Sequence, residues 1–184
     1  MSERLFAAVI LPAEVVDAID RFLQPRRDAE PGLRWTVPDG WHLTCAFLPR
    51  VALTQVEPLE ETLGEVAART GRFRLTLAGS GAFPDASRAT VLWLGVLEGA
   101  DDLAQLAVRC RNAASGCGVE VDGGRFRPHL TLARTKPFAA RRWLTVLDAI
   151  PAQSWPVEEF ALVRSRLLRG GAGYEVLGRF PLAG

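Results

Sequence analysis

Apolar residues recur along this chain with two different periods, which predict strands and helices in an irregular order. Alternation and short apolar runs predict strands over residues 5–11, 33–37, 41–48, 73–77, 89–96, 119–121, 125–134, 157–168 and 174–182. Spacings of three and four residues predict helices over residues 15–24, 56–67, 101–115 and 139–150. Several strands follow one another without a helix between them, so the pattern predicts an α+β fold of mostly antiparallel sheet with outer helices.

Local signals indicate where these elements begin and end. Pro25 is expected to end the first helix, because a proline inside a helix removes a backbone hydrogen bond. Thr54 and Glu57 form a capping-box signature at the start of the second helix. The glycine-rich residues 169–173 are expected to join the last two strands as a hairpin.

The strand predicted over residues 41–48 has two different faces. On strict alternation, one face is expected in the core and carries the side chains of Trp41, Leu43, Cys45 and Phe47. The opposite face then carries the side chains of His42, Thr44 and Ala46. The histidine and the threonine are therefore expected to project together from a strand whose other face is buried.

The tripeptide His-Leu-Thr occurs twice, at residues 42–44 and 129–131, and holds both histidines of the chain. In a strand, a residue and the one two places further on project from the same face, about 7 Å apart. Each copy therefore offers an imidazole and a hydroxyl side by side, from His42 and Thr44 and from His129 and Thr131.

The elements around the two copies follow a loosely repeated order of strand, helix, strands with a His-x-Thr, and helix. We therefore interpret residues 1–184 as a single domain with two pseudo-symmetric lobes, each contributing one motif strand. The two motifs are expected to face each other across a central cleft.

The charge balance argues against a long nucleic-acid interface. The 22 basic and 21 acidic residues give a net charge of +1, so any anion site has to be local. A small basic cluster surrounds the second motif and consists of Arg125, Arg127, Arg134 and Lys136. The 3 cysteines lack a Cys-x-x-Cys spacing and favour a reducing compartment. Because no apolar stretch has the length of a membrane span, we expect a cytoplasmic protein without a membrane partner.

Two imidazoles from opposite walls of one cleft can act as general base and general acid on a phosphodiester. An ordinary histidine pKa near neutrality allows one ring to be neutral while the other is charged, and predicts a bell-shaped rate profile centred near neutral pH. The two threonine hydroxyls can donate hydrogen bonds to phosphate oxygens. Either histidine alone would more often be an ordinary strand residue, but the repeated motif favours a catalytic pair.

A metal site is the main chemical alternative, and the sequence disfavours it. Two histidines without a third ligand at metal spacing make a poor cage. Cys45, three residues from His42, is expected on the opposite face of the strand. We therefore predict catalysis without a metal or another cofactor.

Segments outside the two motifs add a family resemblance. They are Arg4-Leu5-Phe6, Arg34-Trp35, Ala46-Phe47-Leu48, Leu92-Trp93-Leu94-Gly95, residues 126–134, Val163-Arg164-Ser165 and Gly173-Tyr174. Together with the motifs they resemble the LigT-like two-histidine phosphoesterases, and among these the RNA 2',3'-cyclic phosphodiesterases, once named 2'-5' RNA ligases. One departure is Cys45, where the family usually carries a larger aliphatic residue.

The resemblance implies hydrolysis of an RNA-terminal 2',3'-cyclic phosphate to a 2'-phosphomonoester without a metal. His42 would protonate the departing 3' oxygen, and His129 would deprotonate the attacking water. Thr44 and Thr131 would bind phosphate oxygens, and Arg134 is a candidate for a further phosphate contact. Strict alternation points Arg134 away from His129, so this last role requires a bulge or the end of the strand.

The partners that the resemblance implies are RNA ends, oligonucleotides or nucleotides with a 2',3'-cyclic phosphate, and we expect the protein to be a monomer. Trp35 is a candidate for stacking on a base. Two alternatives remain open. The same site could join RNA ends through a 2'-5' bond, or the chain could be a nucleotide- or RNA-binding module without turnover.

Overall fold

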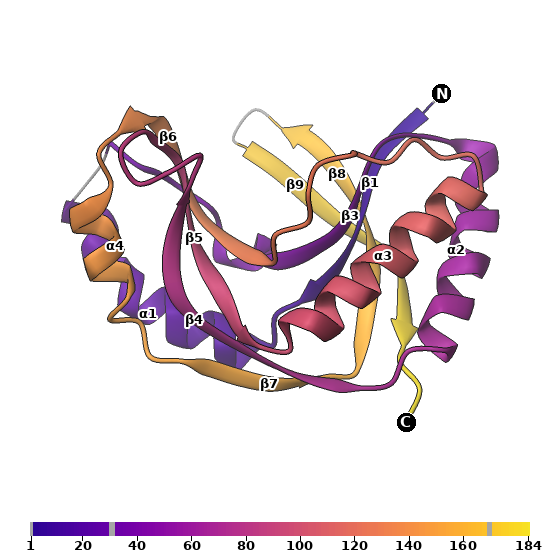
Figure 1. Cartoon of the computed structure of the whole chain (residues 1–184). Coiled ribbons are helices and arrows are strands. Elements are labelled where there is room, and N and C mark those ends of the chain that lie inside the picture. The colour runs from indigo at the N-terminus through magenta and orange to yellow at the C-terminus, as the bar shows by residue number, and fades with distance from the viewer. Residues whose placement is uncertain (1, 30–31, 169–170) are drawn as a thin grey trace.

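The structure, a computed structural model, describes residues 2–29, 32–168 and 171–184. This part of the chain forms a four-stranded sheet and a five-stranded sheet, with four α-helices around them (Figure 1). The predicted α+β architecture with antiparallel sheets is therefore confirmed. Across the described ranges, no helix is both long enough and apolar enough to cross a membrane.

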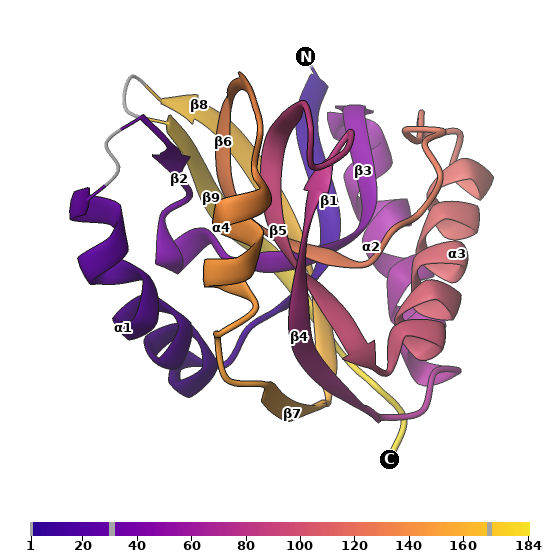
Figure 2. The same cartoon turned by 60° about the vertical axis from the view of Figure 1, so that its left-hand side comes forward.

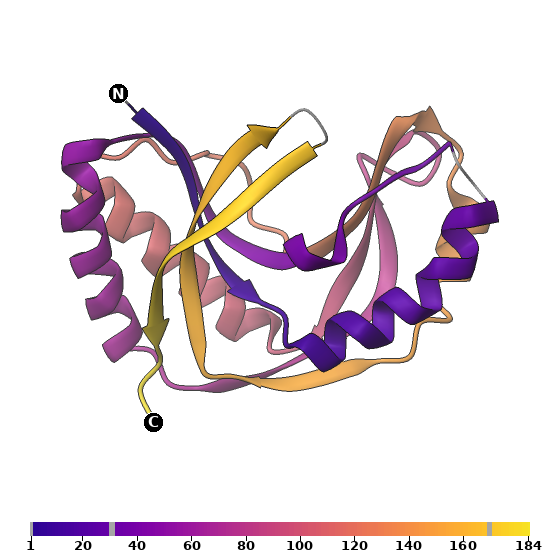
Figure 3. The same ribbon diagram turned by 180° about the vertical axis from the view of Figure 1, so that it is seen from behind.

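The first sheet combines strands from both ends of the chain. Its order is β3-β1-β8-β9, and its neighbouring strands are antiparallel. The strands are β1 (Ser2–Ile10), β3 (His42–Ala52), β8 (Glu159–Leu168) and β9 (Gly171–Pro181). Seen from behind, β8 lies beside β1, and β9 follows on the far side of β8 (Figure 3). The first motif therefore lies in a sheet that the N-terminal half of the chain does not complete by itself.

The second sheet carries the second motif and has the order β2-β6-β5-β4-β7. Its strands are β2 (Arg34–Trp35), β4 (Phe73–Phe83), β5 (Ala89–Glu98), β6 (His129–Phe138) and β7 (Gln153–Val157). The short strand β2 pairs with β6, so a segment that precedes the first motif supports the second.

Three predicted boundaries were wrong in this part of the fold. The strand expected over residues 125–134 begins only at His129, because the preceding loop follows β3, where the Asp122 amide donates to the Phe47 carbonyl over 3.0 Å. The strand expected over 157–168 begins at Glu159 as β8, and Val157 ends a separate strand, β7, of the other sheet. The helix expected over 139–150 spans only Arg141–Leu147. Within the expected glycine-rich turn, residues 169 and 170 lie outside the described residues.

The helices cover the outer sides of the two sheets. They are α1 (Ala13–Ala29), α2 (Leu53–Ala68), α3 (Ala100–Gly116) and α4 (Arg141–Leu147). Helices α2 and α3 lie on the side of the first sheet, and α1 and α4 on the side of the second (Figure 2). A single 3-10 turn, η1 (Pro38–Gly40), leads into β3.

Helix α1 continues through Pro25, contrary to the prediction. Its buried stripe includes Ile19 and Leu23, which are both fully buried, so packing offsets the backbone cost of the proline. Arg26 donates to the Phe22 carbonyl in the same region. Helix α1 is thus held by its buried face beyond the point where its local sequence predicts an end.

Helix α2 begins at Leu53 and not at the predicted capping box. The strand β3 ends at Ala52, and the Ala52 amide donates to the side-chain oxygen of Gln55 over 2.9 Å. This bond satisfies a backbone donor at the helix start, so the predicted roles of Thr54 and Glu57 were wrong. The amide group of Gln55 also donates to the carbonyl of Gly118, which ties the helix to the loop after α3.

Candidate active site

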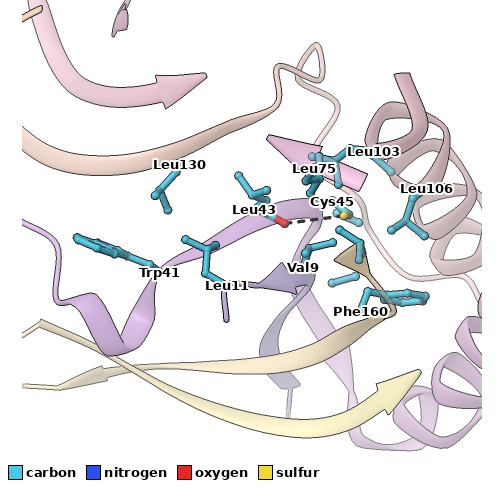
Figure 4. Close-up of a cluster of buried hydrophobic side chains, with 14 of the residues drawn as sticks. Val9, Leu11, Trp41, Leu43, Cys45, Leu75, Leu103, Leu106, Leu130 and Phe160 are labelled. Carbon is cyan, nitrogen blue, oxygen red and sulfur yellow. Dashed lines mark hydrogen bonds between the residues drawn. The ribbon is translucent and has the colours of Figure 1, made fainter. Parts of the chain in front are cut away.

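The middle residue of each motif fixes the direction of its histidine and threonine. Leu43 on β3 and Leu130 on β6 are each 1% exposed and belong to one hydrophobic core (Figure 4). Cys45 and Trp41 lie in the same core, as expected from the sequence. Because strand residues alternate between faces, burial of the two leucines turns the flanking imidazoles and hydroxyls out of the core.

Strand β3 contains an extra residue directly after its motif. Ala8 of β1 pairs with Thr44, but Ala7 pairs with Ala46, so Cys45 has no partner of its own on β1. This is a β-bulge, and an extra residue reverses the alternation of every side chain that follows it.

The bulge overturns the predicted places of two residues. Ala46 is buried in the main core beside Cys45. Phe47 packs instead against Phe6, in the small cluster on the face that carries His42. The prediction that Phe47 lies in the main core and Ala46 on the motif face was therefore wrong, because strict alternation fails at the bulge.

Strand β6 contains the same irregularity at the equivalent position. Trp93 of β5 pairs with Thr131, but Leu92 pairs with Ala133, so Leu132 is the extra residue. Leu132 and Ala133 are consecutive and both fully buried. The two motif strands thus share the order of histidine, leucine, threonine and bulge.

The bulge in β6 brings Arg134 onto the face of His129 and Thr131. Arg134 is exposed and pairs in register with Arg34 of β2 and Val91 of β5. This is the orientation that the candidate phosphate contact required. Arg34 and Arg134 are directly opposite each other, and like charges in this position repel. A bound anion would reduce this repulsion, so the pair forms a local positive site that favours an anion.

Both imidazoles are held by the same hydrogen bond. Nδ1 of His42 lies 2.6 Å from the Gly40 carbonyl, and Nδ1 of His129 lies 2.6 Å from the Arg127 carbonyl. A carbonyl can only accept, so each Nδ1 carries the proton and donates it. In both rings Nε2 is therefore the nitrogen left for proton transfer.

The ring of His42 is held between two aromatic side chains. It stacks on Phe6 with ring centroids 4.4 Å apart, and Tyr174 packs edge-on against it with ring centroids 5.3 Å apart. Tyr174 can approach because Gly40 lacks a side chain, since a Cβ there would meet the tyrosine ring at 2.7 Å. Gly40 therefore supplies the carbonyl that orients His42 and leaves the space in which the Tyr174 ring packs.

The ring of His129 has a similar aromatic environment from the second sheet. The Phe83 ring packs edge-on against it with ring centroids 4.9 Å apart, and the centroid of the Trp93 ring lies 6.2 Å from that of His129. The Arg127 guanidinium lies 5.8 Å from the Phe83 centroid. The Arg127 side chain thus contacts Phe83, which packs on His129, the imidazole that the Arg127 carbonyl orients.

The positive charge of Arg134 acts on both imidazoles of the site. Burial lowers the pKa of His42 below its ordinary value of 6.5, the Gly40 carbonyl opposes this, and the positive charges of His129 and Arg134 lower the pKa further. Burial also lowers the pKa of His129, with the Arg127 carbonyl opposing and Arg134 adding to the decrease. A positive charge disfavours the charged form of an imidazole, so Arg134 favours the neutral state of both rings.

The two motif threonines carry hydroxyls that are available to a ligand. Thr44 and Thr131 are half-buried, and within the described ranges neither hydroxyl forms a side-chain hydrogen bond. A half-buried hydroxyl gains from a ligand acceptor, because water can satisfy it only in part. Both threonines therefore suit an anionic group held between the motif strands.

Thr36 was missed by the sequence reasoning and links the two motif strands. Its hydroxyl lies 2.9 Å from the carbonyls of Thr131 and Leu132, at the bulge of β6. It also accepts from the indole of Trp41 over 2.8 Å, and Trp41 directly precedes His42. Nothing in the local sequence around Thr36 signals this contact, which depends on the pairing of β2 with β6.

Other candidates from the sequence lie further from the motifs. Trp35 packs edge-on against Trp143 of α4, with ring centroids 5.3 Å apart, so packing accounts for its place. Burial raises the pKa of the Cys45 thiol to about 12, which keeps the thiol protonated in the core.

A metal-binding cluster is not found in the described part of the chain, and a cavity of the molecule lies away from the motifs. Among the residues that the structure describes, no three His, Cys, Asp or Glu side chains form a group that could hold a metal ion. A cavity of about 350 Å³ is lined by residues 9–12 and 155–161 and by Arg179. It contains no motif residue.

Comparison with known proteins gives one consistent family. A family model described as the 2'-5' RNA ligase superfamily matches residues 15–167. The RNA 2',3'-cyclic phosphodiesterase of Geobacillus stearothermophilus is 34% identical over 181 residues, which is 97% of this chain but only 57% of that relative's length. The Escherichia coli protein of the same name is 33% identical over 180 residues, covering 98% of this chain and 97% of the relative.

A solved structure agrees with these sequence relatives. Escherichia coli LigT complexed with 3'-AMP matches with a TM-score of 0.82 and 30% sequence identity, over 100% of both chains. The two folds therefore correspond over their whole length.

Proposed function

Since the chain belongs to the 2'-5' RNA ligase superfamily, we propose that it hydrolyses RNA-terminal 2',3'-cyclic phosphates to 2'-phosphomonoesters with a pair of histidines. The observation that carries the proposal is the matched pair of motif strands, in which each histidine donates from Nδ1 to a backbone carbonyl and leaves Nε2 for proton transfer. The names of the relatives support the substrate class, and a nucleotide complex of the structural neighbour supports nucleotide binding.

In the proposed reaction each imidazole transfers one proton through Nε2. Neutral His129 takes a proton from water, whose oxygen attacks the phosphorus atom. The bond from phosphorus to the 3' oxygen then breaks, and protonated His42 gives its Nε2 proton to that oxygen. The carbonyls of Gly40 and Arg127 keep both rings in the orientation that this exchange requires. The products are a 2'-phosphate and a free 3'-hydroxyl.

The remaining site residues stabilise charge on the phosphoryl group. Thr44 and Thr131 would donate hydrogen bonds to its non-bridging oxygens, and Arg134 would add a charged contact. The two rings have the same hydrogen bond, and their pKa values are shifted in the same direction, so these features do not distinguish the acid from the base. The roles of acid at His42 and base at His129 are therefore assigned from the family resemblance. The expected monomeric state and cytoplasmic location remain predictions.

The test of this proposal is product analysis with a short oligoribonucleotide that ends in a 2',3'-cyclic phosphate. We expect the wild-type protein to convert it to the 2'-phosphate at an unchanged rate in the presence of EDTA. Formation of a 2'-5' joined product from cleaved RNA halves would favour the ligase alternative. Binding of a nucleotide monophosphate without any turnover would favour a non-catalytic module.

The pH dependence should reflect the lowered histidine pKa values. In the free protein, the base becomes neutral and the acid loses its proton below the ordinary value of 6.5, so the optimum of kcat/KM is expected below pH 6.5. A bound phosphodiester is negative and raises both pKa values, so the bell-shaped profile of kcat should lie at higher pH. Steady-state rates between pH 4.5 and about 9 test this, and identical profiles for the two parameters would contradict it.

A further inference from the structure

A cation held on an aromatic ring lies beside the site without a role in the proposed chemistry. The guanidinium of Arg4, on β1, lies over the ring of Phe47, on β3, 4.8 Å from its centroid. Arg4 is exposed, and Phe47 is half-buried. The pair exists because the bulge after Thr44 turns Phe47 out of the main core.

The pair is continuous with the surroundings of His42. Phe47 packs against the cluster that contains Phe6, and the Phe6 ring stacks on His42. Along β3, Phe47 is three residues beyond Thr44, a distance of at most about 10 Å. An RNA whose end is held at Thr44 can therefore present a backbone phosphate a few nucleotides upstream to Arg4.

The charge of Arg4 is not neutralised by a neighbouring acid in the described part of the chain. The nearest acid in sequence, Glu3, pairs with Arg164 at 2.8 Å, and Arg164 also holds Glu175 at 3.0 Å. No salt bridge or side-chain hydrogen bond of Arg4 is found within the described ranges, where its contact is the Phe47 ring. An exposed, oriented and uncompensated arginine on the motif face is suited to a phosphate.

We propose that Arg4, held over Phe47, binds a backbone phosphate of the RNA upstream of the terminal nucleotide. The inference rests on the proposed function and names its substrate class, an oligonucleotide end in preference to a mononucleotide. Phe47 limits the movement of the guanidinium, so less side-chain freedom is lost when the phosphate binds. A mononucleotide cyclic phosphate has no upstream phosphodiester and gains nothing from this contact.

The experiment compares a tetranucleotide that ends in a 2',3'-cyclic phosphate with the corresponding 2',3'-cyclic mononucleotide. For Arg4→Gln, the ratio of kcat/KM for the longer substrate to that for the shorter should fall about two- to fivefold. The salt dependence of the tetranucleotide reaction should lose about 0.7 of its logarithmic slope, as one phosphate contact to a single strand predicts. Arg4→Lys keeps the charge and should retain the wild-type slope.

The matched control is Arg21→Gln, which removes an exposed arginine from α1 and should leave the ratio and the slope unchanged. An unchanged ratio in Arg4→Gln, or an equal loss for both substrates, would overturn the upstream contact. Failure of the wild-type protein to turn over either substrate would instead contradict the proposed function, so the two ideas fail separately.

Discussion

Replacement of either motif histidine by alanine is expected to lower kcat/KM for an RNA-terminal cyclic phosphate by about a hundred- to ten-thousandfold. His42→Ala removes the proposed donor to the departing 3' oxygen, and His129→Ala removes the proposed acceptor of the water proton. Both side chains are half-buried at the face of a sheet, so their loss should leave the core intact. Initial rates with a cyclic-phosphate oligonucleotide measure the effect.

Loss of stability has to be separated from loss of chemistry in these variants. Cys110 is fully buried in α3, so Cys110→Ala is expected to lower the free energy of unfolding by about 1 kcal/mol with little change in kcat. Each histidine variant should show the opposite behaviour, with a near wild-type melting temperature and little activity. Wild-type rates in either histidine variant would contradict the two-histidine mechanism.

Arg134→Gln is expected to have the next largest effect, a decrease in kcat/KM of about 10- to 100-fold, as for loss of a hydrogen bond to a charged group. The substitution should also change the pH profile. The charge of Arg134 lowers the pKa of both His42 and His129, so its removal should raise both values. Both limbs of the kcat/KM profile should therefore move to higher pH.

The matched control for this prediction is Arg142→Gln. Arg142 is exposed on α4, and its loss changes the net charge of the protein by the same amount. We expect the control to keep the wild-type rate and profile. A large rate loss in Arg134→Gln without any shift of the two limbs would show that Arg134 acts only on the fold or on binding, and not next to the imidazoles.

The alternation of apolar and polar residues was enough to predict which face of each motif strand carries the histidine and the threonine. Leu43 and Leu130 are buried, as the pattern requires, and this orients the flanking histidines. The alternation failed after the threonine of each motif, at the bulge residues Cys45 and Leu132. A bulge depends on how the partner strand pairs, and the sequence of β3 or β6 alone contains no sign of an unpaired residue.

Contacts between distant segments account for most of what the sequence could not predict. Thr36 reaches β6 only because the two-residue strand β2 joins the second sheet. Tyr174 covers His42 only because β9 joins the first sheet beside β8. Helix α1 passes Pro25 because its buried face outweighs a local stop signal. In each case the pairing of elements decides the outcome, and pairing is not a local property of the chain.

The central claim is that His42 and His129 act as one unit on one phosphorus atom, and a double-mutant cycle tests it most directly. The measurement is kcat for the wild-type protein, His42→Ala, His129→Ala and the double variant with the same cyclic-phosphate oligonucleotide. Groups that act together are strongly non-additive, so the double variant should be about as slow as the slower single variant. A double variant slower by the product of the two single losses would mean that the histidines act independently, which would contradict the account.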